Sequence, residues 1–327
     1  MMKARWSGFC RSVTLAAALC SASWPLATAG EAGAPTTALT LGTATQGGGF
    51  QLFGQNMAEV INHVDPTLRI EAIATRGSRQ NLGLLEKRDI DIGLVEGNAA
   101  RQALDGIGRP PADLRVLGVM YPNPGTFVVR ADAPYRTLDD LRGQAIAFGT
   151  RASGLRILAN DVLDGLGLSP EKDFEQVILD KAGDGPRMVL DGSVAALWGA
   201  GIGWPGFVKI ADGEAGARFI PPSAEQIQQI LARHPHLRPM SIPANTYRGQ
   251  DRQVDSVGLW SLILIHPDVS DDIAYRLARA IHQGQQAMTE RLPQGRFTTV
   301  ENTVREVPAS RLHQGAARYY REIGLLP

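Results

Sequence analysis

Cysteine is almost absent from this chain of 327 residues. Its two cysteines, Cys10 and Cys20, both lie near the amino terminus, in a segment that we interpret below as a removable leader. The remainder of the chain therefore contains no thiol. This excludes disulfide bonds and cysteine catalysis from the part that folds.

An excess of charge of one sign is also missing, because 33 lysines and arginines balance 33 aspartates and glutamates. Removal of residues 1–29 takes away three basic residues and no acidic ones, which leaves 33 − 3 = 30 basic against 33 acidic residues. A nearly neutral chain lacks the basic footprint of a nucleic-acid-binding protein. We therefore expect no nucleic-acid partner.

The common catalytic motifs are absent as well. The chain has no P-loop, no H-E-x-x-H and no G-x-S-x-G, and its glycine loop lacks the dinucleotide spacing. Residues Ser169–Lys172 match the S-x-x-K motif in letters alone, because they lie in a predicted loop and not in the structural context that the motif needs. His234 and His236 have no third ligand nearby in the sequence. We therefore predict no enzyme activity, no cofactor and no metal site.

The amino terminus has the layout of a secretory signal peptide. Three basic residues come first, an apolar run covers residues 13–19, and an A-x-A pattern ends at Ala29. A membrane anchor needs about 20 apolar residues, and serines and a proline interrupt this run. A lipoprotein cysteine at Cys20 is an alternative, which Leu19 disfavours. We predict a signal peptide at 1–29, a flexible leader at 30–38 and a periplasmic location.

The chain that follows alternates between strands and helices. Strands are predicted at 39–44, 68–74 and 90–95, separated by a helix from Phe50 and a helix over 78–87. The first helix carries apolar residues on one face, at positions 50, 53, 57, 60, 61 and 64. Strands joined by single helices imply right-handed crossovers. The prediction is an α/β fold with a parallel sheet covered by helices on both faces.

The pattern restarts after residue 125. Strands are predicted at 126–130, 144–149, 174–179 and 194–198, with a helix start at 137–140 and a helix over 154–166. A long apolar strand at 257–265 and a helix over 271–288 follow. The strands ending at Asp132 and Asp268 have the appearance of two crossings between lobes, although they read equally well as ordinary strands. We predict lobe one from 39–130 plus 262–327 and lobe two from 131–261.

The loop from Thr43 to Phe50 carries three consecutive glycines before the first helix. Glycines allow close approach of a ligand to the backbone, and the helix start presents unpaired N–H groups that suit an anion. A tight turn between strand and helix is the equally supported alternative. The loop is therefore a candidate site for a carboxylate.

Five segments resemble the TAXI-type solute receptors of tripartite ATP-independent periplasmic (TRAP) transporters. The first strand and its glycine loop, the segment T-R-G-S-R-Q-N-L at 75–82 and the strand D-I-D-I-G-L-V at 89–95 are similar to the family pattern. The segments P-A-N-T-Y-R-G-Q-D at 243–251 and H-Q-G-A-A-R-Y-Y-R at 313–321 resemble its two most specific motifs. The resemblance extends from about Leu39 to Ile323.

This resemblance implies a type II periplasmic-binding-protein fold, with two α/β lobes, two hinge strands and a ligand cleft between them. It implies a small anionic solute, such as glutamate or a dicarboxylate, that is delivered to a TRAP membrane subunit by a monomeric receptor. A ligand-sensing subunit for a membrane histidine kinase is one alternative, and a transferase on the same fold is another. The residues alone do not separate transport from sensing.

The sequence departs from the family pattern at Phe50-Gln51, Glu96-Gly-Asn98, Ala152–Leu155 and Ala195, where ligand contacts are expected. Arg76 and Arg151 are candidate carboxylate ligands, or else solvated loop residues. Glu96 would bind an ammonium group or point away from the site. Trp204 forms a cleft wall or packs in the core. The full set of candidate ligand-binding residues is Thr45, Gly47, Gly48, Gly49, Phe50, Arg76, Ser78, Asn81, Asn98, Arg151, Ser153, Gly154 and Trp204.

Overall fold

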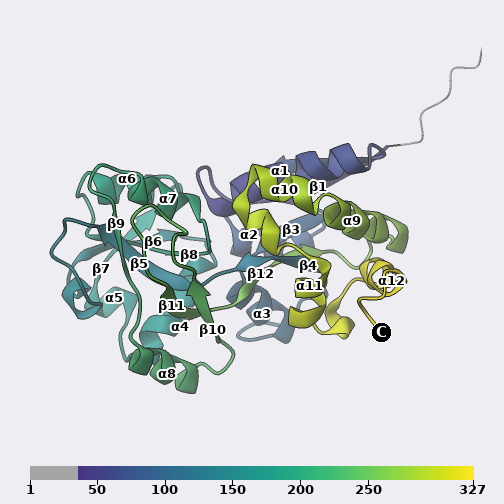
Figure 1. The fold of residues 1–327 in the computed structure, drawn as a ribbon. Helices are drawn as coiled ribbons and strands as arrows, with labels where there is room; N and C mark the ends of the chain where they lie inside the picture. The colour runs from purple at the N-terminus through teal and green to yellow at the C-terminus, as the bar shows by residue number, and fades with distance from the viewer. Residues whose placement is uncertain (1–35) are drawn as a thin grey trace, which may run out of the picture. The chain divides into compact units, whose positions relative to one another are not determined.

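The computed structural model describes residues 36–327 (Figure 1). The predicted signal peptide and the predicted leader up to residue 35 lie outside the described residues. Among the helices described, none is both long enough and apolar enough to cross a membrane.

The first lobe is built on a five-stranded sheet with the order β2-β1-β3-β12-β4. Strand β1 lies parallel to β2 and β3, whereas β12 runs antiparallel to β3 and β4. Both early and late parts of the chain form this lobe, as the purple and yellow ribbons show in Figure 1. The strands are β1 (Thr37–Gly42), β2 (Leu68–Ile73), β3 (Ile92–Val95), β4 (Arg115–Pro122) and β12 (Trp260–Ile265).

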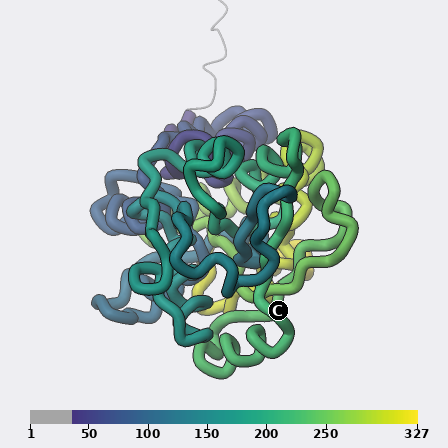
Figure 2. Tube along the Cα trace, turned by 90° about the vertical axis from the view of Figure 1, so that its left-hand side faces the viewer, coloured from purple at the N-terminus to yellow at the C-terminus, as the bar shows by residue number. Residues whose placement is uncertain are grey.

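The second lobe contains a five-stranded sheet with the order β7-β6-β8-β5-β9 and a separate antiparallel pair, β10-β11. Here β6 is parallel to β7 and β8, and β5 is antiparallel to β8 and β9. Figure 2 places this lobe toward the viewer. The strands are β5 (Gly125–Arg130), β6 (Ala145–Thr150), β7 (Glu175–Leu179), β8 (Ala196–Ala200), β9 (Ala217–Ile220), β10 (Arg238–Ile242) and β11 (Val254–Gly258).

The fold class predicted from the sequence is confirmed, and β1 lies parallel to β2 and β3 as predicted, although both sheets also contain antiparallel strands. Each sheet contains an antiparallel strand that enters directly from the other lobe, β5 in one case and β12 in the other. A strand that arrives this way follows no βαβ crossover, so the rule that makes successive strands parallel does not apply to it.

Helices cover both sheets, and most begin where a loop leaves the end of a strand. Helix α1 buries Phe53, Met57, Val60 and Ile61 on the face predicted from periodicity. The predicted helix over 271–288 is interrupted at Gly284, and only a short 3₁₀ turn forms at 139–141. The helices are α1 (Gly49–Val64), α2 (Ser78–Glu86), α3 (Gly97–Asp105), α4 (Leu155–Gly165), α5 (Pro170–Asp173), α6 (Asp184–Leu190), α7 (Pro205–Ala211), α8 (Ala224–Arg233), α9 (Asp271–Gln283), α10 (Gln285–Arg291), α11 (Val300–Glu306) and α12 (Gln314–Glu322).

The chain crosses between the lobes twice, from β4 to β5 and from β11 to β12, and the two crossings lie side by side. The backbone N–H of Asn123 donates to the carbonyl of Leu259 (3.1 Å), and its side-chain amide donates to the Ser261 hydroxyl (2.6 Å). A Cβ at Gly258 would overlap the Asn123 carbonyl. Glycine at position 258 therefore lets the two crossings touch.

The crossings lie a few residues from the positions predicted. Residues 126–130, which the sequence-based division gives to lobe one, form β5 in the second sheet. The apolar stretch 257–265 is two strands, interrupted at Leu259, rather than one. We propose that the lobe boundaries fall at about residues 123–124 and 259, because the strands on either side of these positions belong to different sheets.

Each lobe has its own hydrophobic core. One cluster fills the first lobe, and two clusters lie on the two faces of the second sheet. The two family-like motifs of highest specificity contribute to this packing. Tyr320 donates from its hydroxyl to the carbonyl of Leu117 (2.7 Å), and His313 accepts the Gly315 N–H at the start of α12.

Candidate functional site

A cavity lies between the lobes, where loops that follow strands of both sheets face one another. It offers about 60 Å³ to the centres of water-sized groups. Most predicted site residues line it, namely Thr45, Gly48, Gly49, Phe50, Arg76, Ser78, Ser153, Gly154 and Trp204.

The glycine loop forms the first wall, and its glycines have separate roles. Gly47 has a φ of +76°, and a Cβ there would lie 2.7 Å from the Cα of Gly183 in the second lobe. Gly48 is the N-cap of α1. A Cβ at Gly49 would lie 2.7 Å from Cδ1 of Trp204. The run of glycines therefore allows the second lobe to pack on the first turn of α1, in addition to leaving its amides open to the cavity.

The indole of Trp204 comes from the second lobe and forms the opposing wall. Its backbone N–H donates to the hydroxyl of Tyr247 (3.0 Å), which itself donates to the carbonyl of Gly201 (2.9 Å). Tyr247 belongs to the motif at 243–251, and Gln250 of that motif accepts the Tyr247 N–H (3.2 Å). This motif therefore supports the loop that carries Trp204 and does not itself line the cavity.

Two polar groups of aromatic residues meet at this wall. A Cβ at Gly49 would lie 3.0 Å from Nε1 of Trp204 and 3.3 Å from the hydroxyl of Tyr121. Both residues line the cavity. Burial raises the pKa of the Tyr121 phenol well above its ordinary value, so the phenol remains a neutral donor. Tyr121 is not among the residues predicted for the site, because it lies inside a strand, β4, that was not predicted.

Arg76 is the predicted arginine that the structure brings to the cavity. Its side chain is exposed and lines the cavity, while its backbone N–H donates to Oε1 of Gln80 (2.7 Å). Arg151 is exposed and lies outside the lining. Of the two candidate carboxylate ligands, only Arg76 therefore borders the space that a ligand would occupy.

The second-lobe loop before α4 is the counterpart of the glycine loop. The hydroxyl of Ser153 accepts the N–H of Leu155 (3.2 Å), which caps the first turn of α4. A Cβ at Gly154 would lie 2.5 Å from Cβ of Glu96 and 2.9 Å from the hydroxyl of Ser78. Glycine at position 154 therefore lets the start of α4 approach the first lobe closely.

Glu96 is a buried carboxylate at this contact and lines the cavity. Its Oε2 accepts the N–H groups of Asn98 (3.0 Å) and Ala99 (3.3 Å), and its Oε1 accepts the Asn98 side-chain amide (3.1 Å). Glu96 is thus the N-cap of α3. Burial raises the pKa of Glu96 to about 7 despite these hydrogen bonds. Its side chain therefore exchanges a proton near neutral pH.

Three further predicted residues lie outside the cavity lining. Gly47 contacts the second lobe, as described above. Asn81 is fully buried and donates to the carbonyls of Gly42 (3.1 Å), Thr43 (2.8 Å) and Leu94 (2.8 Å), so it joins the ends of two strands. Asn98 binds Glu96, and its Oδ1 has no hydrogen-bond partner among the described residues.

Among residues 36–327, four hydrogen bonds join the lobes around the cavity. The N–H groups of Ala182 and Gly183 donate to the hydroxyl of Thr45 (3.1 Å) and the carbonyl of Gln46 (3.2 Å), respectively. The other two are from the N–H of Arg79 to the carbonyl of Ala152 (3.2 Å) and from the Thr150 hydroxyl to the carbonyl of Arg76 (3.4 Å). These contacts hold the two lobes together on both sides of the cavity.

Comparison with solved structures gives the same fold at low sequence identity. MatC from Rhodopseudomonas palustris, with bound malate, matches with a TM-score of 0.57 and 14% identity, over 87% of this chain and 95% of that one. The alkanesulfonate-binding protein SsuA from Xanthomonas axonopodis pv. citri, bound to MOPS, matches with a TM-score of 0.50 and 18% identity, over 90% and 96%. Both likenesses indicate the type II periplasmic-binding-protein fold. Residues 41–324 also match one sequence family, and the chain belongs to this NMT1-like family.

Proposed function

We propose that this protein is a solute-binding protein of a membrane transporter and captures a small organic anion between its two lobes. The observation that carries the proposal is the donor set of the cavity. The first turns of α1 and α4, the Trp204 indole, the Tyr121 phenol and the Arg76 guanidinium all border one space. Helix amino termini and N–H or O–H donors favour negative charge.

The size of the cavity supports a compact acid. A space of about 60 Å³ for the centres of water-sized groups suits a short carboxylic acid better than a nucleotide or a long alkyl chain. An amino acid such as glutamate and a dicarboxylate are the two ligand classes that we propose. The finer assignment to a TAXI-type receptor, with a TRAP membrane subunit as partner and a periplasmic location, rests on the resemblance of the sequence motifs.

The ligand is identified first by native mass spectrometry of protein purified without denaturation. A thermal-shift screen of organic acids and amino acids follows, with malate and an alkanesulfonate included. Binding to the folded state alone stabilises it by RT ln(1 + [L]/Kd), about 2.7 kcal/mol at a hundredfold excess over Kd. A saturable shift with one class of acid, without conversion of that acid, supports the proposal. Turnover at many equivalents per protein would instead indicate an enzyme.

The pH dependence of binding separates the two ligand classes, because Glu96 borders the cavity and titrates near neutrality. A dicarboxylate binds better to the protonated, neutral Glu96, so its affinity should fall above pH 7. An amino acid that places its ammonium group on the Glu96 carboxylate should bind more tightly above pH 7. Titration calorimetry at pH 6 and pH 8 with the identified acid, repeated with Glu96→Gln as the control that does not titrate, distinguishes them.

A further inference from the structure

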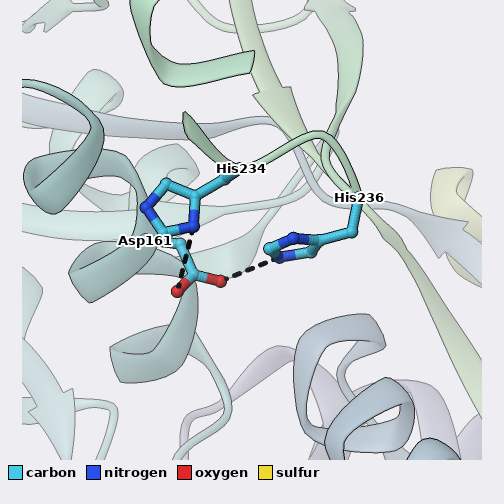
Figure 3. A group of neighbouring side chains, drawn as sticks. All are labelled: Asp161, His234 and His236. Carbon is cyan, nitrogen blue, oxygen red and sulfur yellow. Dashed lines mark hydrogen bonds and ion pairs between the residues drawn. The ribbon is translucent and has the colours of Figure 1, made fainter. Parts of the chain in front are cut away.

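The fold brings a third metal-ligating side chain to the pair His234 and His236. The two histidines follow α8 at the start of the loop that leads to β10, whereas Asp161 lies in α4. Figure 3 shows the Asp161 carboxylate between the two imidazole rings. Sequence analysis predicted no metal because it found no third ligand near the histidine pair. Asp161 is 75 residues from His236 in the chain, so no local sequence pattern indicates this contact.

The distances within the group are close to those of a coordination sphere. Oδ2 of Asp161 lies 3.1 Å from Nε2 of His236, and Oδ1 lies 3.9 Å from Nδ1 of His234. The three candidate ligand atoms all lie within 4.8 Å of one another. Tetrahedral zinc, with bonds of about 2.0–2.2 Å to nitrogen and oxygen, places neighbouring ligand atoms roughly 3.3 Å apart. Small side-chain adjustments therefore bring all three atoms onto one ion.

A second carboxylate orients one of the rings. Nε2 of His234 lies 2.8 Å from Oδ2 of Asp164, which leaves Nδ1 directed toward Asp161. Asp164 is held in turn by Arg233, through hydrogen bonds of 2.6 Å and 2.8 Å. Histidine ligands in metalloproteins commonly bond a carboxylate through the ring nitrogen that does not coordinate. This contact is therefore independent support for a metal-binding role of His234.

Solvent reaches the group without a change of fold. The side chains of Asp161, His234 and His236 are 19%, 17% and 16% exposed, respectively. His236 also lines an open groove of about 370 Å³. An ion can therefore enter and retain one water molecule as a fourth ligand.

We propose that Asp161, His234 and His236 form a binding site for a divalent transition-metal ion of the zinc class. The bound ion would join the loop before β10 to α4, the helix whose first turn lines the ligand cavity. The ion would stabilise the second lobe and hold α4 in position. The existence of the site does not depend on which solute the cavity binds. The alternative is a group held by hydrogen bonds alone, in which His236 donates to Asp161 and His234 donates to Asp164.

The test is calorimetric titration of chelator-treated protein with zinc chloride. Wild-type protein should bind one zinc ion, and His236→Gln or Asp161→Asn should weaken binding at least a hundredfold. Asp164→Asn should weaken it about 10- to 100-fold, the usual effect of losing an orienting carboxylate. His63→Gln, which changes an exposed histidine at the end of α1, is the matched control and should bind as the wild type does.

Cobalt(II) provides a reading on unaltered protein, so the test does not depend on how the variants fold. A site with three protein ligands and one water should give the intense visible bands of four- or five-coordinate cobalt, and zinc should abolish them. Weak bands like those of the hexaaqua ion would overturn the proposal and leave the hydrogen-bonded group. Zinc binding by His236→Gln at the affinity of the His63→Gln control would overturn it equally.

Discussion

Replacement of Glu96 by glutamine should remove most of the loss of stability that the protein suffers as pH rises from 5 to 8. Glu96 has an ordinary pKa of 4.5, and burial raises it to about 7. Below pH 4.5 the group is protonated in both the folded and unfolded states. Between pH 4.5 and about 7 the unfolded chain ionises while the folded protein stays protonated, so stability is lost, and above pH 7 both states ionise and the loss levels off. The difference of about 2.5 pKa units corresponds to about 3 kcal/mol.

The measurement is the free energy of unfolding by urea at pH 5, 6, 7 and 8 for wild type and Glu96→Gln. Wild type minus variant should fall by about 2.5 kcal/mol over that range, because part of the loss already occurs below pH 5. Burial lowers the pKa values of His236 and His313, which gives both proteins a stability that increases with pH and cancels in the difference. Asp65, whose pKa is lowered to about 2 by Arg276, titrates below this range. A difference that stays constant from pH 5 to pH 8 would refute the reasoning.

Three more outcomes follow from the site and the hinge. Arg76→Ala should weaken ligand binding about 10- to 150-fold in calorimetry, which is the scale of a charge-assisted hydrogen bond. Arg151→Ala should change binding little. Equal losses in the two variants would contradict the assignment of Arg76 as the arginine that contacts the ligand. Tyr247→Phe leaves a buried N–H and a buried carbonyl unpaired and should cost about 1–3 kcal/mol in urea unfolding. Gly258→Ala should lower the free energy of unfolding by about 1–3 kcal/mol or more, because the added Cβ meets the main-chain carbonyl of Asn123. Gly83→Ala is the control and should not lower it, because the space around Gly83 is open.

Periodicity and turn residues identified the elements whose signal is local. Helix α1 was predicted because Phe53, Met57 and Ile61 recur on one face, and that face is buried. The stretch 97–122 yielded no prediction, although it forms α3 and β4, because α3 is short and β4 is buried along nearly its whole length without alternation. The break at Leu259 escaped notice for a similar reason, since both strands that flank it are apolar. What ends these strands is contact with the other crossing, which is tertiary information.

The candidate site shows the same division between local and distant information. The glycine loop and the loop before α4 were found because each joins a strand to a helix start. Arg76 and Arg151 have equivalent positions in such loops, and only the placement of the lobes distinguishes them. Tyr121 reaches the cavity because it lies at the end of β4, and Glu96 reaches it because Gly154 of the second lobe approaches closely. No local sequence pattern predicts either arrangement.

The hydrogen bonds that join the lobes around the cavity bear on the kinetics of capture. Three of the four donors are main-chain N–H groups, and two of the four bonds use a side-chain hydroxyl, that of Thr45 or Thr150. Side-chain substitution therefore removes at most half of them. Because these bonds do not involve the solute, they favour the closed form whether or not solute is bound, and the apparent dissociation constant then depends on the fraction of molecules with a binding-competent site. If closure shields the cavity, entry of solute waits for these bonds to open. The association rate should then level off at high solute concentration, at the rate of opening, and release should be slow for the same reason.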